Sequence, residues 1–152
     1  MAEKYMKRYH VGLGNVGSYQ VSARPWVSSS IHVPYSGAVG VDQGASTANR
    51  AVINFPYVTK FVTIRNDGPN VHGATMRVAF SEAGLSDGNA NYFILSGAES
   101  FSADFKVTRL YLMGHDGNYT AATTVTTASV IAGLTGIEAG LLSGSWNGHD
   151  GV

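Results

Sequence analysis

The 152-residue chain contains no cysteine and carries little charge. Without cysteine it can form neither a disulfide framework nor a thiolate metal site. Charged residues make up 13% of the sequence, against about 25% in ordinary soluble domains. The ten basic and ten acidic residues cancel, so the charge balance favours neither nucleic acid nor an anionic membrane as a partner. Such a charge-poor surface suits a free monomer badly, and we expect partners to cover much of it.

Long apolar runs are also missing. No stretch approaches the roughly 20 apolar residues that a membrane-spanning helix needs. The basic residues 1–10 are not followed by the apolar segment of a secretion signal. We therefore expect a non-secreted protein without a membrane partner, long enough to bury the core of a single domain.

Short runs typical of β-strands, separated by turn residues, dominate what is present. Residues 57–65, YVTKFVTIR, place Val58, Val62 and Ile64 on one face of an extended chain. NDGPN at residues 66–70 then ends the strand with a dense turn signal.

Two apolar runs follow along the chain. Residues 74–80, ATMRVAF, place Met76, Val78 and Phe80 on one face. Residues 91–96, NYFILS, are almost continuously apolar, a pattern that predicts a buried strand.

The clearest alternation lies in residues 101–107, FSADFKV. The five-residue link at 96–100, SGAES, predicts a hairpin with the preceding run. The apolar parity then changes at Leu110 and Leu112, as a bulge or a switch between sheets would produce. The apolar face of this run comprises Phe101, Ala103, Phe105 and Val107.

Eight or nine strands and almost no helix predict an all-β sandwich or barrel. The remaining predicted strands are residues 18–23, 26–33, 49–55 and 123–133. Residues 135–142, TGIEAGLL, have some helical character, which their two glycines weaken. We expect a jelly-roll-like sandwich of about eight strands, with an immunoglobulin-like sandwich as the second choice.

Glycine content divides the chain into three parts. Residues 18–132 form the predicted β-sandwich domain. Residues 1–17 and 133–152 are richer in glycine and less periodic, and we interpret them as terminal arms on that single domain.

Gly12, Gly14 and Gly17 have the Gly-x-Gly-x-x-Gly spacing of a dinucleotide-binding loop. That site needs a buried strand before the glycines, a helix after them and an acidic residue about 20 positions later. KRYHV precedes the glycines, Pro25 interrupts any following helix, and residues 4–41 contain no acidic residue. The glycines therefore favour an arm that passes close to a neighbour over a nucleotide site.

The histidines and the Asp-Gly pairs offer no metal pattern. SDGN at 86–89, HDGN at 115–118 and HDG at 149–151 each supply one carboxylate, whereas a calcium loop needs several. Asp-Gly is typical of tight turns, which is the interpretation we adopt. A histidine cluster assembled by the fold stays an alternative. No two histidines stand three or four residues apart, and they are His10, His32, His72, His115 and His149.

No motif predicts catalysis. Gly-x-Ser-x-Gly and a nucleophilic thiol are both absent, and the Asn-x-Thr sequon at 118–120 has no secretion signal to support it. The carboxylates available for glycoside chemistry are Glu82, Asp87, Glu99 and Asp104. The aromatic candidates for lining a sugar or peptide groove, residue types that in a sandwich are more often core or interface anchors, are Trp26, Tyr35, Tyr57 and Trp146. We predict no catalytic, cofactor-binding or metal-binding residue, and hence no enzyme and no cofactor.

Three segments carry a resemblance to a known group of proteins. They are YHVGLGNVGSYQVSARPW, FPYVTKFVTIRND and NYFILSGAESFSADFKVTRLYL, at residues 9–26, 55–67 and 91–112. Together they resemble virion structural proteins of tailed double-stranded DNA phages, in particular head decoration or cement proteins. The likeness spans about residues 18–146 and rests on pattern rather than on a catalytic motif.

The resemblance implies a compact β-sandwich on the capsid exterior, made in the host cytoplasm. It implies binding to the major capsid protein as a homo-oligomer, with a trimer favoured, and carries over no catalytic residue. A tail, collar or fibre-attachment component with receptor or glycan binding is the alternative. A small β-fold enzyme acting on cell-wall sugars is a third hypothesis, with no motif in its favour.

Overall fold

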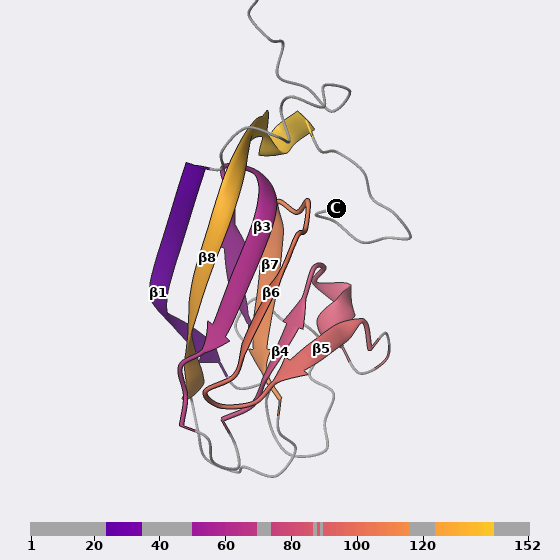
Figure 1. Ribbon diagram of the computed structural model, residues 1–152. Coiled ribbons are helices and arrows are strands. Elements are labelled where there is room, and N and C mark those ends of the chain that lie inside the picture. Colours follow the sequence, from indigo (N-terminus) through magenta and orange to yellow (C-terminus); the bar gives the residue numbers. More distant parts are fainter. Residues whose placement is uncertain are drawn as a thin grey trace, which may run out of the picture.

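The computed structural model describes residues 24–34, 50–69, 74–86, 88, 90–115 and 124–141. These residues form eight strands in two four-stranded antiparallel sheets, packed face to face as a sandwich (Figure 1). This part of the chain contains no α-helix. It has two short 3₁₀ turns, η2 at Ala83–Leu85 and η3 at Ala139–Leu141.

Each sheet mixes strands from both halves of the chain. The first sheet has the order β1 (Arg24–Pro34), β8 (Thr124–Glu138), β3 (Tyr57–Asn66), β6 (Ser100–Ala103). The second has the order β2 (Ala51–Asn54), β7 (Arg109–Gly114), β4 (Met76–Ala79), β5 (Tyr92–Leu95).

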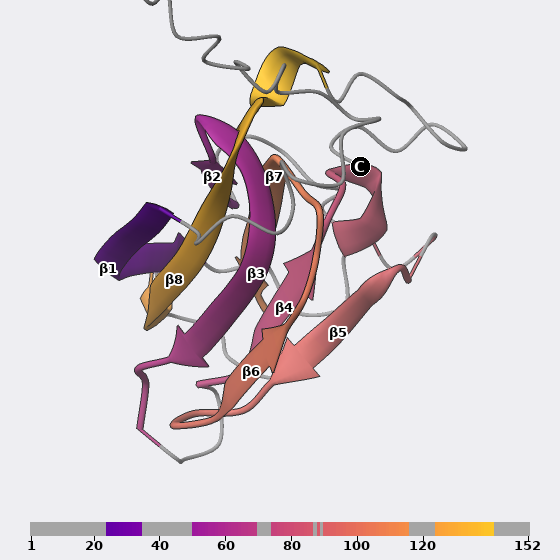
Figure 2. The same cartoon turned by 45° about the horizontal axis from the view of Figure 1, so that its top comes forward.

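The pairing pattern is that of a jelly roll. Strand β1 pairs with β8, β2 with β7, β3 with β6 and β4 with β5, all antiparallel. This is one long antiparallel ribbon, folded over so that alternate strand pairs enter opposite sheets, which produces the two Greek keys of a jelly roll. Strands β1 and β5 consequently lie at opposite sides of the molecule (Figure 2). The all-β prediction and the jelly-roll topology are both confirmed.

The core lies between the sheets and follows from strand alternation. On β3, Val58, Val62 and Ile64 are fully buried, as their shared face predicts. On β4, Met76 and Val78 are also fully buried. At about 25 cal/mol per Å² of buried apolar surface, these inward faces supply the main stabilisation of the sandwich.

The predicted strands at 26–33, 49–55, 57–65 and 74–80 correspond to β1, β2, β3 and β4. The parity change before Leu110 is a switch between sheets, because β6 belongs to the first sheet and β7 to the second. The strand predicted at 18–23 lies outside the described residues.

The predicted hairpin between the runs at 91–96 and 101–107 is wrong. Strand β5 pairs with β4, whereas β6 pairs with β3 in the other sheet, so the intervening link crosses from sheet to sheet. The expectation of a buried strand at 91–96 is wrong as well, because β5 is an edge strand whose Ile94 is exposed.

The C-terminal part of the fold is more regular than expected. Strand β8 runs to Glu138, so residues 135–138 are strand, and the helical character of 135–142 is limited to η3. Pairing of β8 with β3 continues beyond Leu134 to Glu138. The expected boundary at residue 132 therefore falls within a strand. The arm at 1–17 lies outside the described residues, as do residues 142–152.

Candidate functional site

The outer face of the first sheet presents an uncharged row that crosses all four strands. Val27 of β1 lies opposite Ile131 of β8, which lies opposite Thr63 of β3, which lies opposite Ser102 of β6. Val27 is 63% exposed and Ile131 is 45% exposed, although aliphatic side chains this large are usually buried. We call this surface the Val27–Ile131 face.

The flanks of the Val27–Ile131 face differ in polarity. In the neighbouring row, towards the start of β1, Pro25 and Phe61 lie on either side of Gly133 of β8. Pro25 is exposed and Phe61 is half-buried, so these two side chains extend the apolar part of the face. On the other side, Arg65 Nε lies 3.5 Å from Asp67 Oδ1, and Ser129 Oγ donates a 2.5 Å hydrogen bond to Asp67 Oδ2. Arg65 and Asp67 at this margin pair with each other, so the row of Val27, Ile131, Thr63 and Ser102 itself offers only apolar and hydroxyl contacts.

No strand or 3₁₀ turn of the described ranges packs over the Val27–Ile131 face (Figure 1). The middle of the outer face of the second sheet, in contrast, is covered by the segment that contains η2, while Val52 and Ile94 towards its two edges are exposed. Leu85 is fully buried there against Ala79, Tyr111 and Met113.

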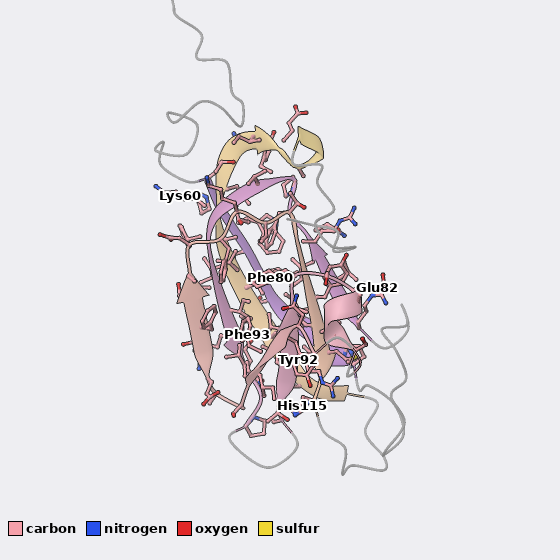
Figure 3. The ribbon with its side chains drawn as sticks, turned by 90° about the vertical axis from the view of Figure 1, so that its right-hand side faces the viewer. Lys60, Phe80, Glu82, Tyr92, Phe93 and His115 are labelled. Atoms are coloured by element: carbon pink, nitrogen blue, oxygen red, sulfur yellow. The ribbon has the colours of Figure 1, made fainter. Side chains whose placement is uncertain are left out.

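Two buried arginines hold this covering segment in place. Arg77 Nε donates a 2.9 Å hydrogen bond to His115 Nδ1, and Arg77 Nη1 donates one of 2.9 Å to the Leu85 carbonyl. The guanidinium carbon also lies 4.5 Å from the centre of the Tyr92 ring, a cation–π contact. Tyr92 and His115 lie near each other at the lower part of Figure 3.

The second arginine is Arg50. Its Nη1 lies 2.5 Å from Glu82 Oε1, with the arginine side chain 4% exposed and the glutamate side chain 52% exposed. The Arg50 guanidinium also lies 5.9 Å from the centre of the Tyr111 ring. Arg50, which directly precedes β2, and Arg77 of β4 are therefore buried by their contacts with the η2 segment and hold that segment against the sheet.

The candidate metal residues do not come together within the part of the chain that the structure describes. No group of three or more histidine or acidic side chains lies there at metal-binding distances. His32 is exposed on β1, and His115 accepts the hydrogen bond from Arg77. The remaining histidines, His10, His72 and His149, lie outside the described residues. The same is true of the candidate nucleotide-binding glycines, Gly12, Gly14 and Gly17.

Two of the three candidate carboxylates that can be placed have structural contacts, and the third is exposed. Glu82 pairs with Arg50, Glu99 Oε2 accepts a 2.8 Å hydrogen bond from the Ser96 amide in the link between β5 and β6, and Asp104 is exposed after β6. Asp87 lies outside the described residues. Within these ranges, no helix is sufficiently long and apolar to cross a membrane.

The candidate aromatic residues are divided between core and surface. The Trp26 ring packs edge-on against Phe55 at 5.0 Å between the sheets, and Tyr57 is half-buried under the Arg24 guanidinium at 5.8 Å. Tyr35, Trp146 and the sequon at 118–120 lie outside the described residues. Trp26 is therefore a core anchor.

Sequence reasoning missed the two buried arginines. Arg77 stands between Met76 and Val78, so alternation places it on the outer face of β4, where a charged residue is ordinarily solvated. Its burial depends on the η2 segment, which is packed by tertiary contacts that a local pattern does not contain. Comparison with known proteins adds no relative, because no protein-family model, no curated protein and no solved structure matches this chain.

Proposed function

We propose that this protein is a non-enzymatic virion structural protein that decorates a phage capsid and stabilises it by binding the major capsid protein lattice. The observation that carries the proposal is the Val27–Ile131 face, where none of the described strands or 3₁₀ turns packs over the outer face of the first sheet and the exposed row is aliphatic and hydroxylic. The resemblance of the strand segments to phage decoration proteins supplies the identity of the partner.

The chemistry of the face suits a broad, shallow protein contact. Val27 and Ile131 gain about 25 cal/mol for each Å² of apolar surface removed from water. Thr63 and Ser102 already bond each other at 2.8 Å, so each hydroxyl keeps one hydrogen bond when a partner covers the face. A partner therefore buries this row without desolvating an isolated charge.

A single contact of this size is weak, because four strands spaced about 4.8 Å apart present a face roughly 20 Å wide. Repetition on a lattice compensates for this weakness, since linked copies bind with an avidity that exceeds each separate affinity. The chain thus acts as a homo-oligomer on the capsid exterior, and a trimer is the order that the resemblance implies.

Rebinding to stripped particles tests the proposal. Capsids from which the protein has been removed are mixed with wild-type protein, Ile131→Lys or Val52→Lys, and the bound fraction is measured by co-sedimentation. Val52 is the matched control because it is an exposed aliphatic residue on the other sheet. We expect wild type and Val52→Lys to rebind and Ile131→Lys to bind at least about tenfold more weakly, since a buried unpaired lysine is costly.

Two results would contradict this function. If the wild-type protein did not rebind, the capsid lattice would not be its partner. If Ile131→Lys bound as well as wild type, the Val27–Ile131 face would not be the binding surface.

A further inference from the structure

The two sheets leave four edge strands, and three of them have features that discourage pairing with another chain. Strand β1 contains Pro25 and Pro34 and a register shift between Ser28 and Ile31. In strand β6 every second residue is serine, and exposed charged residues follow the strand. Strand β2 has only four residues, including alanine and asparagine, which are depleted in strands. Proline, bulges, charge and short length are the devices that protect natural sheet edges.

Strand β5 lacks these devices apart from its short length. Its residues Tyr92, Phe93, Ile94 and Leu95 include no charge and no proline, and its pairing with β4 is regular throughout. Three of the four residues are of types enriched in strands. Ile94 is 45% exposed, and no described strand pairs with the outer edge of β5, which lies at the margin of the sheet in Figures 1 and 2.

We propose that the β5 strands of two copies of this chain pair antiparallel about a twofold axis. The strand is its own complement, because both of its faces present apolar residues to an incoming strand. Phe93 and Leu95 pack towards the core between the sheets, while Ile94 lies on the outer face, opposite Arg77 of β4.

Strand parity restricts the register of this pair. Residues opposite each other in an antiparallel pair must lie on the same face, so a one-residue slip would place Phe93 against solvent. Ile94 opposite Ile94 of the second copy satisfies the rule, and it places Phe93 opposite Leu95 of the second copy on the inner face. The exposed isoleucines then cover each other in a cross-strand pair.

The same pairing extends the core. Phe93 belongs to a row of half-buried rings along the margin beside β5 and β6, at 4.6 Å from Phe101 and 6.5 Å from Phe80. Figure 3 looks onto this margin, with Phe80 and Phe93 near its centre. A second copy paired along β5 joins the two second sheets into one continuous eight-stranded sheet and brings the two rows of rings together.

The inference is independent of the proposed function, because it concerns only the free protein in solution. It assigns a twofold dimer, whereas the resemblance implies a threefold trimer. The molar mass of the assembly distinguishes the two orders.

Sedimentation velocity on wild type, Ile94→Lys and Val52→Lys tests the pairing at concentrations up to about 100 μM, where even a weak edge contact forms dimers. Val52 is 41% exposed and lies near the middle of a four-residue edge strand on the opposite side of the same sheet, so it is a close control. We expect wild type and Val52→Lys to have twice the 16.0 kDa chain mass. We expect Ile94→Lys to be a folded monomer with an unchanged melting temperature at low concentration.

Amide hydrogen exchange of the wild-type protein gives a second readout that needs no substitution. The amides of β5 that point away from β4 should become more protected as concentration rises, because dimerisation adds hydrogen bonds along the outer edge of the strand. A wild-type monomer or trimer would overturn the proposal. It would equally be overturned by a dimer that persists in Ile94→Lys, by one lost in Val52→Lys, or by one that leaves these amides unprotected.

Discussion

Thr126 Oγ1 donates a 2.6 Å hydrogen bond to Asn66 Oδ1 in the interior of the sandwich, joining β8 to the last residue of β3. The side-chain nitrogen of Asn66, Nδ2, donates to the backbone carbonyls of Ala74, at 2.6 Å, and Leu95, at 3.1 Å. Asn66 Oδ1 also accepts from the Gly68 amide at 3.0 Å. One fully buried side chain thus connects the first sheet with the chain that enters β4 and the end of β5 in the second.

Replacing Asn66 with alanine should destabilise the protein by about 3 kcal/mol, because several buried partners then lose their hydrogen bonds together. Urea unfolding followed by circular dichroism measures the change. Asn54→Ala, at an exposed asparagine on β2, should shift stability by less than about 0.5 kcal/mol. Equal effects at both positions would show that Asn66 does not connect the sheets.

Gly68 has room for hydrogen only. A Cβ placed there would lie 2.2 Å from Thr126 Oγ1, whereas one at Gly88 would meet nothing within 4 Å. Gly68→Ala should therefore cost about 1–3 kcal/mol through overpacking and disturbance of the Thr126–Asn66 bond, and Gly88→Ala should be close to neutral. Thermal unfolding of the two variants checks this. Adding Thr126→Ala to Gly68→Ala should cost less than the sum of the single changes, because the closest clash, with Thr126 Oγ1, is then relieved.

Thr59 sits at the irregular start of β3 and bonds the chain that follows β6. Its Oγ1 donates to the Phe105 carbonyl at 2.5 Å and accepts from the Val107 amide at 3.0 Å. Thr59→Val keeps the shape but leaves the buried Val107 amide unpaired, so we expect a loss of about 2 kcal/mol. Thr63→Val, which removes only the exposed bond to Ser102, should cost under about 0.5 kcal/mol in the same chemical denaturation experiment.

The ion pair between Arg50 and Glu82 should contribute modestly, because the glutamate is half-exposed. We expect Glu82→Gln to reduce stability by about 1 kcal/mol at low ionic strength and by less in high salt. Glu99→Gln is the control, since a glutamine oxygen can still accept the hydrogen bond from the Ser96 amide. A salt-independent loss at Glu82 would mean that the pair does not stabilise the fold electrostatically.

The fold class was predictable because its signals are local. The alternation of Val58, Val62 and Ile64 identifies β3, and the parity change at Leu110 marks the entry into the other sheet. The link at 96–100 was misjudged because its length fits a hairpin and a sheet crossing equally well. The hydrogen bonds that decide between a hairpin and a sheet crossing join residues far apart in sequence. One example is the 2.9 Å bond from the backbone amide of Asn66 to the carbonyl of Glu99.

The candidate surface was less accessible to sequence reasoning. The exposure of Val27 and Ile131 depends on which face of the first sheet is turned away from the core, and the burial of Arg77 depends on the η2 segment. The low charge content predicts contact with partners but assigns it to no particular surface. Val27 lies beside Ile131 because of the register between β1 and β8. That register depends on the pairing of all the strands and cannot be derived from either strand alone.

The proposed decoration role stands or falls with the number of copies of this chain found in purified phage particles. Quantitative mass spectrometry against labelled peptides of this chain and of the major capsid protein measures the ratio, and immunogold labelling locates the copies. A decoration protein predicts a ratio comparable to that of the capsid subunit, with label distributed over the head. A handful of copies per particle, or label confined to one vertex or to the tail, would contradict the account and indicate a tail, collar or fibre-attachment component.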